Sequence, residues 1–416
     1  MLKRAIAGLC GWAAITAAGV GAYAATASTN DQDFKQIERG RQLAVAGDCA
    51  GCHTLPGSGH DFAGGLPVET PFGNLLAPNI TPDAQTGIGG WSDDEFVNAL
   101  TKGTGRNGTH LYPAMPYTYY TKLSRADALA IRAYLKTVPA VHHAVKANQL
   151  PFPFNVRASL SGWDALFFKP GAFKPVPDKS AAWNRGAYLV EGLTHCGMCH
   201  TPKNTFGGDK RDEALQGYAL QGWFAPNITN DERIGVGTWT ADDIAEYLKT
   251  GHNRLSAASG PMGDVITHST SQMADADLHA IATYLKDQPG AKESPPAKAD
   301  AAAVKIGGKI YADECSGCHG HDGKGTPGLF PALAGSPTVR QDDPASLVRV
   351  VVRGARSVGT EQAPTAPAMP SFGWLLNDEQ VADLLTYVRN TWGNASRSVT
   401  ADDVSKARHA LAKRRD

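Results

Sequence analysis

Three copies of one pentapeptide, C-x-x-C-H, constrain this chain more than any other feature of its sequence. They read CAGCH at residues 49–53, CGMCH at residues 196–200 and CSGCH at residues 315–319. With seven Cys and 13 His in 416 residues, composition alone gives only about 0.004 such matches by chance. In this pattern two thiols form thioethers with the vinyl groups of a haem while the adjacent imidazole ligates its iron, so the pattern predicts c-type haem.

The cysteine count supports a dedicated use for each pair. Cys10 lies in an N-terminal segment that we expect to be removed, and the other six cysteines all belong to the pentapeptides. A zinc site would pair one C-x-x-C with a second pair close by, whereas these pairs lie 147 and 119 residues apart. A thioredoxin-like redox pair would not require the histidine each time. We therefore predict three covalently bound haem c groups, attached through Cys49, Cys52, Cys196, Cys199, Cys315 and Cys318.

Two long segments of the chain are copies of one another. APNIT at residues 77–81 recurs at residues 225–229, an offset of 148. Such self-similarity indicates tandem domains, each with its own core. We call residues 37–143 unit 1 and residues 184–290 unit 2, and the third pentapeptide lies in unit 3, residues 303–395.

The pattern within each unit is helical. A short helical run precedes the cysteines, a Gly/Pro-rich loop follows, and a helix with apolar residues at spacings of three and four closes the unit at residues 124–138, 274–288 and 377–392. No segment alternates convincingly with the period of a strand. We expect an all-α chain of three tandem class I-type cytochrome c domains joined by Pro-rich connectors: domain 1 at residues 25–145, a connector at 146–183, domain 2 at 184–290, a linker at 291–302, domain 3 at 303–395 and a basic tail at 396–416.

Each iron needs a second axial ligand besides the histidine, and methionine is the usual choice where a high potential is required. Met115 lies 62 residues after His53, and Met262 lies 62 residues after His200. This equal offset argues against Met273, which lies 73 residues after His200. In unit 3, the segment APAMPSF echoes YPAMPY of unit 1. The predicted iron ligands are therefore His53, Met115, His200, Met262, His319 and Met369.

Other side chains carry weaker signals. Trp91 and Trp239 are 148 residues apart and are candidates for donating an indole N–H to a haem propionate, with a plain place in the core as the alternative. His195 precedes Cys196 and is expected near a haem edge, although unit 1 has Asp48 at that position. The remaining histidines occupy no repeated position, and we expect them in loops or at the surface.

The N-terminal residues read as a targeting segment. Lys3 and Arg4 precede an Ala/Gly-rich apolar run, and AYA at residues 22–24 offers small residues for cleavage, so we expect a secretory signal peptide at residues 1–24. An uncleaved anchor helix is the alternative. No later segment is long and apolar enough to span a bilayer, so we expect a periplasmic protein, soluble or held to the membrane from outside. The formal net charge of zero gives no reason to expect a nucleic-acid partner.

Four longer segments carry a resemblance to a known family: FAGGLPVETPFGNLLAPNITPD, LPFPFN with WDALFF, WNRGAYLVEGLTHCGMCHTP, and CSGCHGHDGKGTPGLFPALAGS. Essentially the whole mature chain resembles the three-haem cytochrome c subunit of membrane-bound dehydrogenases of acetic-acid and related bacteria. The haem-binding residues of that family fall on the three pentapeptides, and its axial methionines fall on Met115, Met262 and Met369.

The resemblance implies an electron-transfer role. Such subunits take electrons from a catalytic dehydrogenase subunit of the quinoprotein, flavoprotein or molybdenum type and pass them to ubiquinone or a terminal oxidase. We expect no catalytic residue in the chain itself, because six-coordinate His/Met haems leave no open position for a substrate. One alternative is a multihaem peroxidase, which needs a vacant or labile sixth position.

A free periplasmic shuttle is the other alternative. It would leave the aromatic connector segments FPFN and WDALFF, which resemble a surface meant to be covered, without a partner. These segments can also simply pack between units 1 and 2. Some relatives carry an apolar C-terminal anchor, whereas this chain ends ADDVSKARHALAKRRD. We expect peripheral membrane association, with the basic tail either touching anionic lipid or, as we favour, forming a frayed, solvated end.

Overall fold

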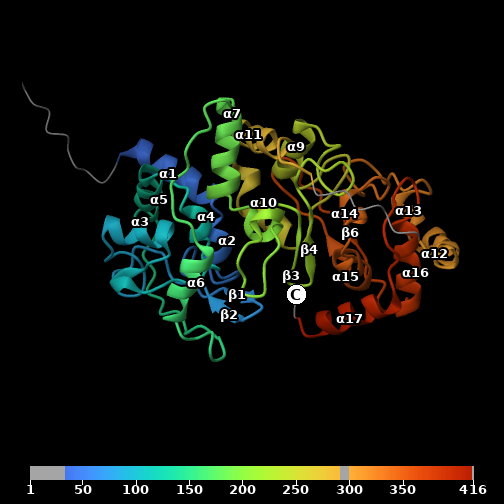
Figure 1. Cartoon of the computed structure of the whole chain (residues 1–416), viewed down its shortest axis with the longest axis horizontal. Coiled ribbons are helices and arrows are strands. Elements are labelled where there is room, and N and C mark those ends of the chain that lie inside the picture. The colour runs from blue at the N-terminus through green and yellow to red at the C-terminus, as the bar shows by residue number, and fades with distance from the viewer. Residues whose placement is uncertain (1–32, 291–298, 415–416) are drawn as a thin grey trace, which may run out of the picture.

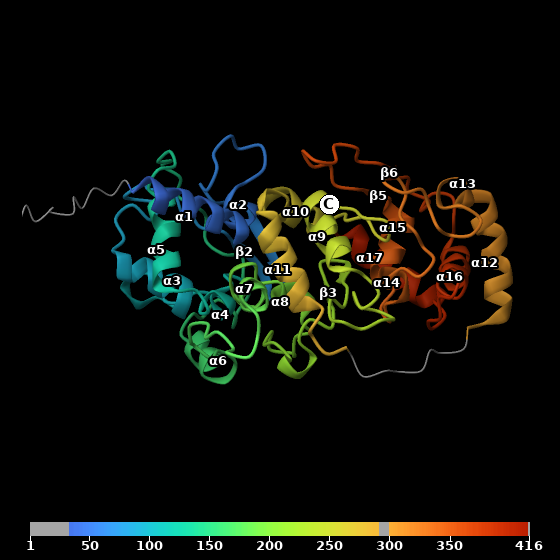
Figure 2. The same ribbon diagram turned by 90° about the horizontal axis from the view of Figure 1, so that it is seen from above.

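The computed structural model describes residues 33–290 and 299–414. The predicted signal peptide at residues 1–24 and most of the predicted linker at 291–302 lie outside the described residues. The helices follow one another along the long axis of the molecule, with unit 1 at one end and unit 3 at the other (Figure 1; Figure 2). No helix of the described segments has both the length and the apolar character needed to cross a membrane.

The elements recur in a similar order in each unit. Unit 1 and the connector contain α1 (Phe34–Ala46), α2 (Cys49–His53), β1 (Pro67–Thr70), β2 (Gly73–Leu76), α3 (Asp93–Lys102), α4 (Tyr117–Tyr120), α5 (Arg125–Leu135) and α6 (Ser159–Phe167). Unit 2 contains α7 (Ala181–Tyr188), the π-helix η2 (Leu189–Leu193), α8 (Gly197–His200), β3 (Tyr218–Leu220), β4 (Trp223–Ala225), α9 (Ala241–Thr250), α10 (Pro261–His268), the 3-10 helix η4 (Thr270–Gln272) and α11 (Asp275–Leu285). Unit 3 and the tail contain α12 (Ala301–Glu314), α13 (Ser316–His319), α14 (Pro337–Arg340), α15 (Ala345–Arg353), β5 (Ala355–Arg356), β6 (Ala368–Met369), α16 (Asp378–Val388) and α17 (Ala401–Ala412).

A glycine lets the first helix of each unit cross the closing helix with the two backbones in contact. The crossings pair α1 with α5, α7 with α11, and α12 with α16. A Cβ atom added at Gly40, Gly186 or Gly307 would lie 1.9, 1.9 or 2.0 Å from the carbonyl oxygen of Ala130, Ala280 or Asp383, respectively. These distances are shorter than any tolerated contact, so only glycine fits. In each unit the C-x-x-C-H motif follows the crossing helix in the chain, shortly after it in units 1 and 3 and after η2 in unit 2.

The prediction that the chain is all-α omitted three small hairpins. Each is a two-stranded antiparallel pair, formed by β1 with β2, β3 with β4, and β5 with β6. Their strands are two to four residues long, which is too short for an alternating pattern to be visible in the sequence. The rest of the described chain consists of helices and loops.

Units 1 and 2 share one hydrophobic core, whereas the repeats predicted a separate core for each unit. One continuous cluster of buried side chains extends from Leu43 in α1 to Leu285 in α11, and a second cluster belongs to unit 3. The two repeats are joined because Leu189, Val190 and Leu193 of unit 2 are almost completely buried within the shared cluster. The repeat pattern reports similarity of two segments, and it does not report whether they pack on each other.

The C-terminal tail is not the solvated end that we expected. Its residues 401–412 form helix α17, which packs on α15 and α16. Val404 and Leu411 are buried with exposed fractions of 0% and 3%. Two of the basic side chains are engaged, since Arg408 pairs with Asp378 and Arg414 pairs with Glu69 of unit 1. The positive charges of the tail therefore help to hold the domain arrangement.

The glycine crossing generates a stability prediction. We expect Gly186→Ala to lower the free energy of unfolding by about 3 kcal/mol, because the added methyl must push α7 away from α11. The control is Gly162→Ala in α6, where the new Cβ meets no atom within 4 Å; removing glycine from that helix should be neutral or stabilise by about 0.5–1 kcal/mol. Chemical denaturation followed by circular dichroism measures both. Equal effects of the two substitutions would contradict the crossing argument.

Candidate functional site

The histidine of each C-x-x-C-H motif is oriented by a proline carbonyl from a later loop. The distance from Nδ1 to the carbonyl oxygen is 2.7 Å for His53 and Pro78, 2.7 Å for His200 and Pro226, and 3.0 Å for His319 and Pro331. Burial lowers the pKa of all three imidazoles, so the rings are neutral at pH 7. A neutral ring that donates from Nδ1 has its lone pair on Nε2, which is then the atom available to a metal.

The proline carbonyls give a role to a motif that the sequence showed only as a repeat. Pro78 and Pro226 are the second residues of the two APNIT segments. In each segment the asparagine side chain, Asn79 or Asn227, accepts from the backbone N–H of the threonine two residues later. This turn holds the proline carbonyl toward the histidine. Unit 3 reaches the same result without APNIT, since Pro331 lies in the segment FPAL.

None of the six motif cysteines forms a disulfide, and burial raises the pKa of several of the thiol groups. It raises the pKa of Cys49 and Cys315 to about 12, and it is also the main cause of the raised pKa of Cys196 and Cys199. A thioredoxin-like nucleophile needs the opposite shift, because the reactive species is the thiolate. Nowhere in the described residues do three or more His, Cys, Asp or Glu side chains converge as they would around a zinc ion.

Unit 2 also fits a haem through donors that lack a protein acceptor. The indole Nε1 of Trp239 is buried and, among the described residues, has no hydrogen-bond partner, and the same holds for Nδ2 of Asn227. The whole Trp239 side chain is only 7% exposed. An unsatisfied buried donor is costly, so a group that brings an oxygen acceptor, such as a haem propionate, would fit here. Trp91, its counterpart in unit 1, is only half-buried.

The three predicted methionine ligands lie in different local structures. Met115 lies in the turn before α4 and packs against the shared core, Met262 is the second residue of α10, and Met369 ends β6 and packs against the core of unit 3. Met273, which the offset argued against, is 5% exposed at the end of η4 and belongs to the shared core.

The attachment motifs of units 1 and 2 face each other across the contact between the two units. Helix α10 of unit 2 packs on α2 of unit 1, and α4 of unit 1 packs on η2 of unit 2. Burial, followed by the Asp48 carboxylate and the Cys199 thiol, raises the pKa of Cys52 to about 11. One cysteine from each motif is therefore close enough to influence the other. We call this contact the 1–2 seam.

Two residues help to build the 1–2 seam, and no sequence pattern predicted this role for either of them. The Tyr119 hydroxyl of unit 1 donates to Asp209 of unit 2 at 2.6 Å, and its ring lies so close to Gly197 that a Cβ there would be 2.9 Å away. His195 lies at the boundary of unit 2 with unit 1, where its Nε2 is 3.4 Å from the carbonyl oxygen of Gly47; its expected place near a haem edge stays a prediction. No signal in a single sequence connects residues 70 to 150 positions apart.

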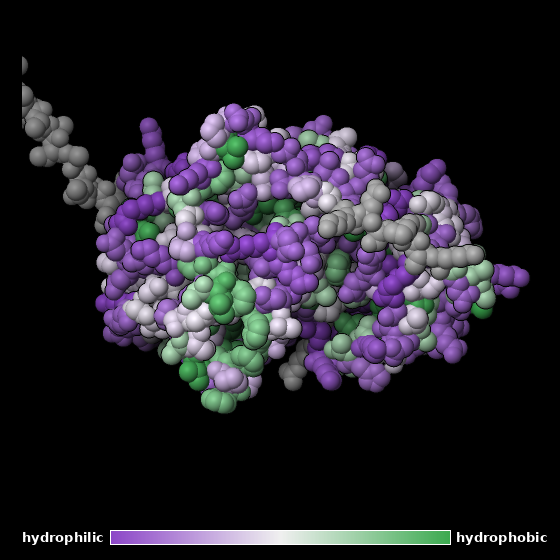
Figure 3. Space-filling model, viewed as in Figure 1, coloured by the Kyte–Doolittle hydropathy of each residue, from purple (hydrophilic) through white to green (hydrophobic). Residues whose placement is uncertain are grey.

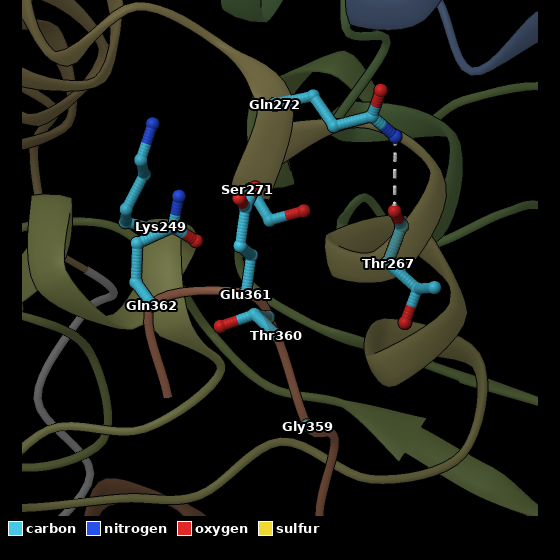
Figure 4. A pocket seen from close by; sticks show the side chains of 8 residues that line it. All are labelled: Lys249, Thr267, Ser271, Gln272, Gly359, Thr360, Glu361 and Gln362. Atoms are coloured by element: carbon cyan, nitrogen blue, oxygen red, sulfur yellow. Dashed lines mark hydrogen bonds between the residues drawn. The ribbon is translucent and has the colours of Figure 1, made fainter. Parts of the chain in front are cut away.

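Unit 3 is joined to unit 2 through the loop that carries Met369. Val358 of this loop donates its backbone N–H to Ala258 at 3.2 Å, and a Cβ on Gly251 would lie 1.8 Å from a Val358 methyl. Beside this contact lies a cavity of about 460 Å³ with polar walls (Figure 4). Gln272 bonds to the backbone of Thr267 at its edge. None of the predicted haem residues lines this cavity, so it is not part of the candidate site.

Comparison with known proteins places this geometry in a family. A model of the cytochrome c family matches residues 37–139 and 304–392. The chain belongs to the cytochrome c family, and its relatives are cytochrome c subunits of dehydrogenase complexes. Haem is thus the expected covalent cofactor.

The similarity to these relatives extends over most of the chain. It is 40% identical over 413 residues to the gluconate 2-dehydrogenase cytochrome c subunit of Pantoea cypripedii, covering 94% of this chain and 93% of the relative. It is 38% identical over 421 residues to the alcohol dehydrogenase (quinone), cytochrome c subunit of Gluconobacter oxydans, covering 96% and 87%. The fructose dehydrogenase cytochrome subunit of Gluconobacter japonicus is 37% identical over 406 residues, which are 89% of this chain and 82% of that relative.

The indole N–H of Trp239, which has no acceptor among the described residues, leads to a prediction about haem potential. We expect Trp239→Phe to leave the haem content unchanged and to lower one haem midpoint potential by tens of millivolts. Without the N–H, the negative charge of a nearby propionate is less stabilised, and it favours ferric iron more strongly. Redox titration of the holoprotein measures the shift. Trp91→Phe is the matched control and should have the smaller effect; equal shifts, or none, would contradict the assignment.

Proposed function

We propose that this chain is the three-haem electron-transfer subunit of a periplasmic membrane-bound dehydrogenase. The observation that carries the proposal is that all three motif histidines are held by a proline carbonyl with Nε2 available. In this arrangement each unit presents the same donor set to one haem. Bound in this way, haem c would supply reversible one-electron chemistry at its iron.

The residues of the chain would hold and orient that group. The two cysteines of each motif would anchor it through thioethers, the Nδ1 hydrogen bond would orient the imidazole, and a methionine thioether would be the second protein ligand and favour the ferrous state. Since this leaves no open position, the chain itself would carry out no bond chemistry on a substrate. The proposed attachment residues are Cys49, Cys52, Cys196, Cys199, Cys315 and Cys318, and the proposed iron ligands are His53, Met115, His200, Met262, His319 and Met369.

Two observations support three cytochrome c domains rather than two. The family model covers residues in units 1 and 3, and unit 2 repeats the APNIT turn of unit 1 with the same histidine-to-proline distance. The glycine crossing of the first and closing helices is present in all three units.

Unit 2 contacts unit 1 through the 1–2 seam and unit 3 through Val358. This order favours a relay with unit 2 in the middle.

The relatives support a proposal for the partner and the location. Their names are those of cytochrome c subunits of gluconate and quinone-dependent alcohol dehydrogenases. We propose that this chain likewise receives electrons from a catalytic dehydrogenase subunit of the quinoprotein, flavoprotein or molybdenum type. It would deliver them to ubiquinone or a terminal oxidase while associated with the outer face of the cytoplasmic membrane.

Isolation of the native protein tests the function. We expect the cytochrome, extracted from membranes in mild detergent, to co-migrate with one large dehydrogenase in fixed ratio, identified by mass spectrometry. The substrate of that dehydrogenase should reduce the haems within the complex, and a pyridine haemochrome assay should give three haems per chain. A cytochrome that is recovered alone from the soluble periplasm would favour the free shuttle. Two haems or fewer per matured chain would refute the haem count.

The choice between two methionines of unit 2 gives a second test. We expect Met262→Ala to remove the methionine–iron charge-transfer band of one haem, because the thioether ligand is lost. Met273→Ala is the matched control: its side chain is 5% exposed in the shared core, so it should keep the band and lower the free energy of unfolding by about 2–5 kcal/mol. Absorption spectroscopy of the oxidised protein measures the band. Loss of the band in the Met273 variant would overturn the ligand assignment.

A further inference from the structure

A continuous aromatic patch lies over the connector, next to the 1–2 seam. Its rings form two groups, with Phe72 and Phe154 at 4.9 Å between centroids in one, and Phe167 and Phe206 stacked at 6.4 Å in the other. The groups are neighbours, since a Cβ on Gly207 would lie 3.1 Å from the ring of Phe72. Trp163 packs on Phe167 and donates its indole N–H to the carbonyl oxygen of Phe206 at 2.9 Å. These contacts join three segments that are distant in sequence: the turn between β1 and β2, the helix α6 with the loop before it, and the loop after α8. We call this surface the aromatic patch.

The most exposed side chains of the patch project outward. The exposed fractions are 81% for Phe152, 77% for Leu166 and 68% for Phe206. Figure 3 shows the resulting apolar area over α6 and the connector loop at the lower left of the molecule. The connector therefore does more than fill the space between units 1 and 2, and large apolar side chains gathered in this way mark an interaction surface.

The connector, which carries most of the patch, has more positive than negative side chains. The connector, residues 146–183, has five Lys or Arg and two Asp, in a chain whose net charge is zero. One of the two carboxylates, Asp164, is turned inward, where it accepts from the Tyr117 hydroxyl at 2.6 Å. Lys169, two residues after the end of α6, is exposed. Arg211, a further exposed cation, donates to the carbonyl oxygen of Phe167 at 2.8 Å, and the exposed Asp212 follows it in the chain.

We propose that the aromatic patch is the surface by which this chain lies on a bilayer containing anionic phospholipid. Aromatic and aliphatic side chains that project from loops and a short helix, with Lys and Arg beside them, are the combination that binds the membrane interface. The cations complement the negative surface of the leaflet. The proposal rests on the membrane association included in the proposed function and specifies the residues that provide it.

Vesicle binding by the holoprotein tests the proposal. The wild-type cytochrome should sediment with vesicles of phosphatidylethanolamine and phosphatidylglycerol. We expect Leu166→Ser and Phe206→Ser each to weaken partitioning about ten-fold, since each removes one large apolar side chain from the inserted surface. Lys169→Gln should weaken binding to these vesicles about five-fold at low salt and leave binding to pure phosphatidylcholine unchanged.

The matched control is Trp374→Ser in unit 3, outside the patch, because Trp374 has the same 81% exposure as Phe152. It should leave vesicle binding unchanged. No binding by the wild type, or equal binding by the wild type and the Leu166→Ser/Phe206→Ser double variant, would overturn the proposal.

Co-isolation of the dehydrogenase with the double variant separates the alternatives. If the double variant loses the dehydrogenase but keeps vesicle binding, the patch is a protein-docking surface and the electron-transfer function stands. If the wild type binds vesicles but no dehydrogenase accompanies it, the surface stands and the proposed function fails.

Discussion

The hydrogen bond between a motif histidine and a proline carbonyl is the interaction on which the candidate sites depend. It determines which ring nitrogen carries the proton and which way the ring faces, and thus which atom is presented to a metal. The bond joins a short helix to a loop 12 to 26 residues further along the chain. It can form only if the loop returns to the helix, and the crossing of the first and closing helices fixes the frame within which it returns. The glycines at that crossing therefore serve the site indirectly, through the position of α2, α8 and α13.

The three units use this frame differently. Units 1 and 2 are similar in sequence and share a core, so their attachment motifs are held at a fixed separation by packing. Unit 3 has its own core and is held to unit 2 by the insertion of Val358 against Gly251, and to unit 1 by the ion pair of Arg414 with Glu69. A relay requires its sites to stay in a constant geometry, and sites supported by rigid elements meet that requirement best. The shared core and the docked tail are two ways of achieving it.

Local patterns in the sequence predicted the parts of the structure that depend on residues close together. The closing helices and the C-x-x-C-H motifs are encoded within windows of five to fifteen residues, and the structure contains helices at those places. The features that depend on contacts between residues far apart in the chain could not be predicted from the sequence. The burial of Leu189 and Leu193 in a shared core, the bond from His195 to Gly47 and the docking of α17 each join segments that no local pattern relates. The solvated-tail expectation failed for this reason, since basic residues were counted without the acidic partners Asp378 and Glu69.

The positions of the aromatic patch and the 1–2 seam are connected by the same side chains. Asp164 of α6 accepts from Tyr117, which begins α4, and Tyr119 of α4 reaches Asp209 in the loop that carries Phe206. The patch is thus attached on one side to the segment after Met115 and on the other to the segment after His200. If this surface lies on the bilayer, the 1–2 seam lies beside the membrane, because the patch is on a side of the molecule that runs along its long axis (Figure 1). A lipid-soluble acceptor would then approach the chain beside the 1–2 seam, so the contacts that hold units 1 and 2 together would also hold the surface that meets it.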